Sequence, residues 1–242
     1  MKGWILDLVN FIFPAECHIC DCKLAPHEEF LCAKCISELP RTGFHRQDLN
    51  PMAERFAGLF PFERATGLFF YNRGSALSQV IQDMKYRSFP GIGILLGKIA
   101  ARELLSTGFF NDIEYVVPVP MHWMKKARRG YNQAEMIARG LCEETGMKLY
   151  DALKMTRPHK TQTRLSREER MKNATNLFKL SKESDLIGKG VLLVDDVCTT
   201  GTTMAEAGRT LYNSCKDIKL SLLTIGVTFI SSKLPSGIIL AE

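Results

Sequence analysis

The chain has 242 residues, of which 45% are hydrophobic and 24% charged, and its formal net charge at neutral pH is +6. These values are typical of a soluble globular protein and exclude a chain dominated by disorder. No apolar run reaches the length of about 18 residues that a membrane span requires, so we expect a cytoplasmic protein without a span.

The first fourteen residues, MKGWILDLVNFIFP, place apolar side chains at helical spacing. We interpret this segment as an amphipathic helix docked on the body of the protein. A helix lying on a membrane surface is the alternative.

Five of the eight cysteines fall between residues 17 and 35, and four of them form two C-x2-C pairs. The first pair is Cys17 and Cys20, and the second is Cys32 and Cys35. Two such pairs supply the four thiolates that a structural zinc ion prefers. An iron–sulfur cluster and a disulfide framework are the alternatives, and the lack of a secretion signal argues against disulfides.

Three further potential metal ligands lie close by in the sequence: Cys22, His18 and His27. We do not expect them to bind the ion, because four cysteines already complete a tetrahedral site. A closed site indicates a structural zinc, whose binding contributes on the order of 10 kcal/mol to folding a segment this small.

The remaining chain alternates strands with helices. We expect strands at 65–71, 113–119, 149–155, 191–194 and 218–230, and helices at 75–86, 91–105, 131–145, 166–173 and after 203. The stretch GIGILLGK at 91–98 matches neither G-x-G-x-x-G nor a P-loop. The pattern predicts an α/β fold with a parallel sheet covered on both faces. We expect residues 1–60 to form a helix and zinc-finger module, and residues 61–242 to form the main domain.

The positive charge is concentrated in one third of the chain. Residues 121–172 contain thirteen Lys or Arg and six acids. Such a concentration favours a polyanionic partner, either the phosphates of a small ligand or a nucleic acid. A solvated surface that only aids solubility is the alternative.

The stretch VLLVDDVCTTGTT, residues 191–203, has the features of a ribose phosphate site. Asp195 and Asp196 follow a buried strand, at the sheet edge where parallel α/β folds bind ligands. Thr203 and Glu206 have capping-box spacing, so the threonine-rich loop feeds a helix N-terminus that attracts phosphate. The chain has no P-loop lysine, and two carboxylates suit ribose hydroxyls with Mg2+ close by. We therefore expect a ribose 5-phosphate ligand.

The same stretch resembles the phosphoribosyl pyrophosphate (PRPP) binding motif of the type I phosphoribosyltransferases. This resemblance implies a type I phosphoribosyltransferase-like parallel sheet flanked by helices and preceded by the four-cysteine zinc module. It places the ribose hydroxyls at Asp195 and Asp196, with Mg2+ accompanying PRPP. It places the 5-phosphate at Thr199, Thr200, Gly201, Thr202 and Thr203.

Taken with the cysteine module, three more segments resemble the ComF family of bacterial competence proteins over nearly the whole chain. They are MKYRS (84–88), PVPMHWMKKARRGYNQAEMIAR (118–139) and TQTRLSREERMKN (161–173). Family positions in the last segment fall on Gln162, Leu165, Arg170 and Asn173. The residues placed near pyrophosphate or another polyanion are Val119, Pro120, Met121, His122, Lys125, Arg128 and Arg129.

The resemblance implies a competence protein that binds PRPP and helps to handle single-stranded DNA during DNA uptake, together with other proteins of the competence machinery. The alternatives are a metabolic phosphoribosyltransferase that releases pyrophosphate and a PRPP sensor without turnover. No catalytic residue is assigned: Thr199 stands where purine-salvage enzymes often have a carboxylate, and we do not expect Cys198 to act. We expect Trp123, Tyr131 and Phe178 to support the fold rather than to stack on bases.

Overall fold

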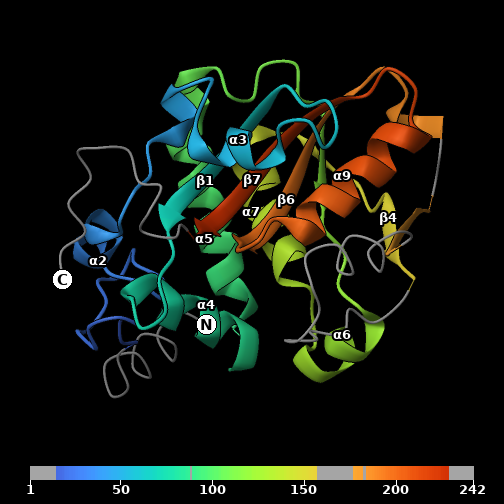
Figure 1. Ribbon diagram of the computed structural model, residues 1–242. Helices are drawn as coiled ribbons and strands as arrows, with labels where there is room; N and C mark the ends of the chain where they lie inside the picture. Colours follow the sequence, from blue (N-terminus) through green and yellow to red (C-terminus); the bar gives the residue numbers. More distant parts are fainter. Residues whose placement is uncertain (1–14, 88, 157–176, 182–183, 229–242) are drawn as a thin grey trace.

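The computed structural model describes residues 15–87, 89–156, 177–181 and 184–228 (Figure 1). The predicted amino-terminal helix and the helix predicted at 166–173 lie outside the described residues, as do Gln162, Leu165, Arg170 and Asn173. Within the described ranges, no helix is both long and apolar enough to cross a membrane.

The elements follow the predicted order closely. The helices are α2 (Ala33–Glu38), α3 (Pro51–Phe56), α4 (Ala76–Tyr86), α5 (Pro90–Leu104), α6 (Trp123–Arg129), α7 (Gln133–Thr145) and α9 (Thr202–Ser214), with short 3-10 turns at Phe44–Arg46, Leu105–Thr107 and Ser184–Leu186. The strands are β1 (Arg64–Phe70), β2 (Tyr115–Pro118), β3 (Lys148–Leu149), β4 (Leu153–Met155), β5 (Phe178–Leu180), β6 (Gly190–Cys198) and β7 (Lys219–Val227).

Five strands form a parallel sheet in the order β1-β7-β6-β2-β3, which confirms the predicted α/β fold. The single strand predicted at 149–155 is wrong, because it is divided between two sheets. β3 pairs with β2, whereas β4 forms an antiparallel hairpin with β5. The chain leaves the main sheet at Tyr150, whose N–H still bonds to the Val116 carbonyl, and then turns.

Alternate residues of the central strand supply two separate cores. Val191 and Leu193 pack on the face that carries α3, α9 and the β4–β5 hairpin. Leu192 and Val194 pack on the face that carries α4, α5 and α7, together with the cysteine-rich segment. Because both faces are covered, the strand is apolar without alternation, as the sequence predicted. In Figure 1 the cysteine-rich segment around α2 lies on the opposite side of the molecule from α9.

The glycines of the stretch GIGILLGK have a packing role. A Cβ at Gly97 would lie 2.1 Å from the carbonyl oxygen of Ile137, and a Cβ at Gly140 would lie 2.1 Å from that of Ile94. The backbones of α5 and α7 therefore approach each other more closely than any side chain allows. The glycine at position 97 is therefore required by the packing of α5 on α7, and it does not indicate a nucleotide-binding motif.

Two local predictions around the functional stretch need correction. β6 does not end after Val194 but runs to Cys198, because hydrogen bonding to β7 continues beyond the acids. The N-cap of α9 is Gly201, with φ of +80° and no side-chain cap, so the capping box predicted at Thr203 and Glu206 is wrong. The carboxylate of Glu206 binds Arg209 at 2.8 Å instead.

Candidate functional site

The two acids lie in the last part of β6, where only one neighbouring strand remains. The pairing of β6 with β2 ends at Val194, whereas Asp195 is still paired with Thr224 of β7. Each carboxylate accepts a hydrogen bond from the following N–H: Asp195 from Asp196 at 2.8 Å, and Asp196 from Val197 at 2.6 Å. Both carboxylates are therefore held close to the backbone of β6 at the carboxyl edge of the sheet.

The environment of Asp195 opposes its charge. Burial and the neighbouring charge of Asp196 raise the pKa of Asp195 to about 7, although the Asp196 N–H and Lys85 act in the opposite direction. A carboxyl group with a raised pKa at a sheet edge indicates a site prepared for a ligand or cation that compensates its charge.

Lys85, at the end of α4, is a site residue that the sequence analysis missed. Its Nζ lies 2.6 Å from Oδ2 of Asp196. Burial favours the neutral amine, but the attraction of Asp196 outweighs it and holds the pKa of Lys85 above its usual value. The two residues are far apart in the chain, so no local pattern could have joined them, although Lys85 belongs to the MKYRS segment.

The threonine-rich loop connects β6 to α9 as predicted. Thr199 and Thr200 are exposed, and the left-handed backbone at Gly201 turns the chain into the helix. The hydroxyls of Thr200 and Thr202 lie 3.0 Å apart. The N-cap residue Gly201 has no side chain to cap α9, and the Thr200 hydroxyl approaches the N–H of Thr202 at 3.5 Å. The start of α9 thus combines backbone N–H groups with threonine hydroxyls, which together suit an anion.

The segment from Val119 to His122 leaves the sheet beside the acids. The N–H of Val119 donates to the Val194 carbonyl at 2.8 Å, and Asn132 donates to the carbonyl of Val119 at 3.0 Å. His122 is buried and caps α6, since its Nδ1 accepts a hydrogen bond from the N–H of Met124. The structure thus brings this predicted segment next to the acid pair, with the imidazole of His122 turned to a structural role.

Helix α6 was not predicted, and within it no residue is buried. Lys125, Lys126 and Arg128 are exposed on this helix, and the guanidinium of Arg129 lies over the ring of Tyr86 at 5.2 Å. The expectation that Trp123 supports the fold is wrong, because its side chain is 70% exposed. The expectation is right for Phe178, which is buried, and for Tyr131, which is partly buried and donates to the carbonyl of Met84.

Cys198, at the end of β6, is buried beneath the loop. Burial raises the pKa of its thiol, although the guanidinium of Arg55 opposes this shift. A buried thiol with a raised pKa is a poor nucleophile, in agreement with the prediction that Cys198 is not catalytic.

Four thiols converge near the amino terminus: those of Cys17, Cys20, Cys22 and Cys32 lie within 4.8 Å of one another. The Sγ atoms of Cys20 and Cys32 are 3.8 Å apart. This is the separation expected for two corners of a tetrahedron with Zn–S bonds of about 2.3 Å. Burial opposes ionisation of Cys17, but the N–H groups around it, that of Cys32 foremost, lower its pKa to about 6. This group of four thiols could therefore hold a metal ion.

The fourth ligand is a choice between two thiols. Cys22, which the sequence analysis set aside, belongs to the compact group and is exposed. Cys35 is buried, and its pKa is raised by burial and by interactions with the thiols of Cys20, Cys32 and Cys17. Cys35 remains our prediction for the fourth position because it completes the second C-x2-C pair with Cys32.

The cysteine-rich segment also contacts α4. Nδ1 of His18 lies 2.8 Å from Oδ2 of Asp83, and Gln79 donates to the His18 carbonyl at 2.6 Å. Helix α4 therefore contacts the cysteine-rich segment through Gln79 and Asp83, and it carries Lys85, the partner of Asp196, near its end.

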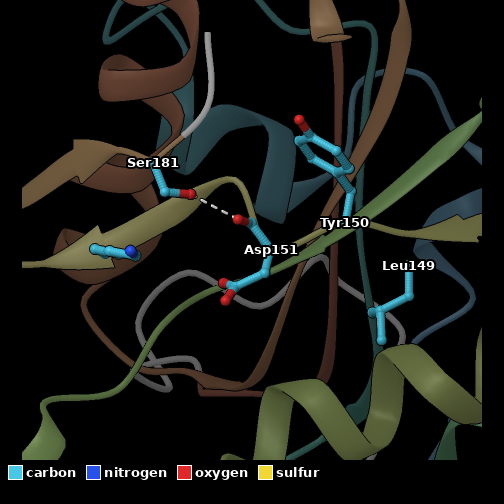
Figure 2. Close-up of a pocket in the computed structure, with 5 residues that line it drawn as sticks. Leu149, Tyr150, Asp151 and Ser181 are labelled. Atoms are coloured by element: carbon cyan, nitrogen blue, oxygen red, sulfur yellow. Dashed lines mark hydrogen bonds between the residues drawn. The ribbon is translucent and has the colours of Figure 1, made fainter.

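A hollow of about 360 Å³ lies apart from these residues, beside β3 and the β4–β5 hairpin (Figure 2). In it the hydroxyl of Ser181 donates to the Asp151 carbonyl. Its lining consists of Leu149, Tyr150, Asp151, Lys154 and Ser181. These include none of the predicted ligand-binding residues, so the candidate site is the sheet edge at Asp195 and not this hollow.

The chain is similar to several known proteins. The phosphoribosyl transferase domain family matches residues 92–220. The chain is 28% identical to competence protein F of Haemophilus influenzae, over 84% of this chain and 93% of that protein. It is also 28% identical to the DNA utilization protein YhgH of Salmonella typhimurium, over 83% of this chain and 92% of that protein. The solved glutamine PRPP amidotransferase of B. subtilis aligns with 20% identity and a TM-score of 0.41, over 59% of this chain and 30% of that one. The family match and the two sequence relatives confirm the predicted resemblance to the ComF family.

Proposed function

The chain belongs to the phosphoribosyl transferase domain family, and on that premise we propose that it binds PRPP as a cytoplasmic ComF-type protein that helps to handle incoming single-stranded DNA. One observation carries the PRPP assignment. The acid pair of β6, the N-terminus of α9 and the segment that follows β2 meet at one edge of the sheet.

Each part of this edge has a role in PRPP binding. Asp195 and Asp196 accept hydrogen bonds from the ribose hydroxyls, and the loop of residues 199–203 donates N–H and hydroxyl groups to the 5-phosphate. The carboxylate oxygens are hard ligands that suit Mg2+, which would share or displace Lys85 at Asp196. Bound Mg2+ supplies positive charge to the pyrophosphate. Lys85 and Arg129 add fixed positive charge from the protein itself.

The PRPP assignment is tested by calorimetric titration of the zinc-loaded, full-length protein with PRPP and Mg2+. We expect saturable binding, which Asp195→Asn combined with Asp196→Asn weakens by about a hundredfold or more. Each substitution removes the negative charge that attracts Mg2+ and replaces one of two acceptor oxygens by an NH2 group that cannot accept from a ribose hydroxyl. Asp48→Asn with Asp185→Asn is the matched control away from the edge. Equal affinity of the wild type and the β6 double variant would contradict the assignment.

The DNA assignment rests on the relatives and on one surface. Both relatives are named for competence or DNA utilization. Helix α6 presents exposed Trp123 and Met124 among exposed Lys125, Lys126 and Arg128. Cations that follow a phosphate backbone, together with an aromatic side chain that stacks on bases, are the two features of a surface that binds single strands.

We expect single-stranded DNA to bind with an affinity that falls steeply with salt. Changing Lys125, Lys126 and Arg128 to Ala should reduce the slope of log affinity against log salt by about 0.7 for each phosphate that these side chains neutralise. The control changes three exposed lysines elsewhere to Ala: Lys34, Lys216 and Lys219. Fluorescence anisotropy titrations from low to high salt measure the affinity and its salt slope for the wild type and for both triple variants. Binding that is undetectable, or that both triple variants weaken equally, would contradict this surface.

A metabolic phosphoribosyltransferase is the second candidate, favoured by the family match itself. Assay of pyrophosphate release from PRPP with Mg2+ and a panel of bases and amines distinguishes the two. Pyrophosphate release that is lost when Asp195 and Asp196 are both changed to Asn would show turnover. PRPP binding with a silent panel would favour the competence role or a sensor.

A further inference from the structure

An arginine from outside the matched family region holds the phosphate loop from behind. Arg55 lies on α3, in the connection between the cysteine-rich segment and the sheet. Its NH1 donates to the carbonyls of Thr199 at 2.7 Å and Cys198 at 3.3 Å, and its NH2 donates to the carbonyl of Thr228 at 2.6 Å. One guanidinium thus joins the end of β6, the entrance to the loop and the residue after β7.

The helix that carries Arg55 is itself firmly anchored. Asn50 is buried and caps α3, accepting from the N–H groups of Met52 and Ala53, each at 3.0 Å. Its amide also donates to the Ala65 carbonyl of β1 at 2.9 Å. Because Asn50 ties the start of α3 to β1, helix α3 holds Arg55 in a defined position relative to the sheet.

Helix α3 also contacts the turn of the loop directly. A Cβ at Gly201 would lie 3.0 Å from Cδ of Arg55 and 3.2 Å from the ring of Phe56. Gly201 therefore allows the loop to pack on α3. Arg55 thus holds the two carbonyls at the entrance of the loop, directly before residues 200–203.

We propose that Arg55 is a positioning residue of the phosphate loop: it fixes the carbonyls of Cys198 and Thr199 and thereby pre-organises residues 199–203 for the 5-phosphate of PRPP. This role rests on the proposed PRPP site. It links the connection at α3 to ligand binding, although α3 lies outside the residues that match the family.

The test compares Arg55→Met with Arg64→Met in the full-length, zinc-loaded protein. Arg64 also donates to backbone carbonyls, at Asn111 and Phe109, but at the amino-terminal end of the sheet. Hydrogen exchange of residues 199–203 is measured without ligand, and affinity for PRPP with Mg2+ is measured by calorimetry.

For Arg55→Met we expect loop exchange to accelerate, and the dissociation constant to rise, by about tenfold or more, the scale expected when charge-assisted hydrogen bonds are removed. We expect Arg64→Met to change neither. In Arg55→Ala, whose short side chain leaves room for the ion, about 10 mM guanidinium, far below the molar range that unfolds proteins, should restore the loop, and equal sodium chloride should not.

Other outcomes separate the two proposals. If Arg55→Met accelerates loop exchange but even the wild type binds no PRPP, the proposed function fails, and the inference keeps only its first part, that Arg55 orders the loop. If loop exchange and affinity are unchanged in folded Arg55→Met, or change equally in Arg64→Met, the positioning role is overturned. Should Arg55→Met fail to fold, Arg55→Lys serves in its place. It keeps the charge, but a single ammonium group cannot reach all three carbonyls, so the same loop readout applies.

Discussion

Removing zinc from the full-length protein is expected to unfold the segment from Cys17 to Leu39 and to destabilise the adjoining α4 and α5. The binding of a structural zinc ion contributes on the order of 10 kcal/mol, and this segment has little core of its own. Its buried residues Leu31 and Leu39 belong to the core that also contains α4 and α5. Chelation followed by hydrogen exchange should therefore show loss of protection there first.

Elemental analysis of cysteine variants identifies the ligands. We expect one zinc per chain in the wild type and in Cys142→Ser, which changes a half-buried cysteine outside the cluster. We expect zinc to be lost in Cys17→Ser and Cys35→Ser and kept in Cys22→Ser. Loss in Cys22→Ser with retention in Cys35→Ser would assign the fourth position to Cys22. Purified wild-type protein without zinc would contradict the metal assignment.

Asp195→Asn is expected to stabilise the ligand-free protein at pH 8. The folded pKa of Asp195, about 7, lies above its ordinary value of 3.8, so the folded state binds the proton more tightly than the unfolded state. Stability from this group is present below about pH 4 and is lost as the pH rises towards 7. The loss amounts to about 4 kcal/mol at most, because each pKa unit corresponds to about 1.4 kcal/mol.

Urea unfolding from pH 4 to pH 8 measures this effect. The stability gap between Asp195→Asn and the wild type should open between about pH 4 and 7 and then stay constant. Asp48→Asn, at an exposed aspartate, is the control and should show no such gap. If the two proteins are equally stable at pH 8, the ionised Asp195 carboxylate does not destabilise the fold and its pKa is not raised. Below about pH 7 Asp195 is protonated and has lost the charge that attracts Mg2+. We therefore expect PRPP to bind more weakly there than at pH 8.

The sequence was informative where local patterns decide the structure. Helix α4 begins after the predicted Ser75, whose hydroxyl accepts from the N–H of Ser78. The strand at 191–194 was recognised because burial on both faces makes it apolar throughout. Helix α6 was missed for the opposite reason: it buries no residue, so no apolar stripe marks it.

The parts of the site that depend on distant contacts were not predictable. Lys85 meets Asp196, and Arg55 meets Thr199 across 144 positions of sequence. Neither pair leaves a spacing signal, because the contacts form only when the sheet places α3 and α4 beside the end of β6. The extension of β6 to Cys198 depends likewise on its pairing with β7 and not on its own polar residues.

The most direct test of the central claim is a crystal of the zinc-loaded protein soaked with PRPP and Mg2+. We expect density for the 5-phosphate in the loop of residues 199–203, with the ribose hydroxyls at Asp195 and Asp196 and the pyrophosphate beside residues 119–122. PRPP bound elsewhere on the molecule, or a sheet edge left empty at saturating PRPP, would contradict it.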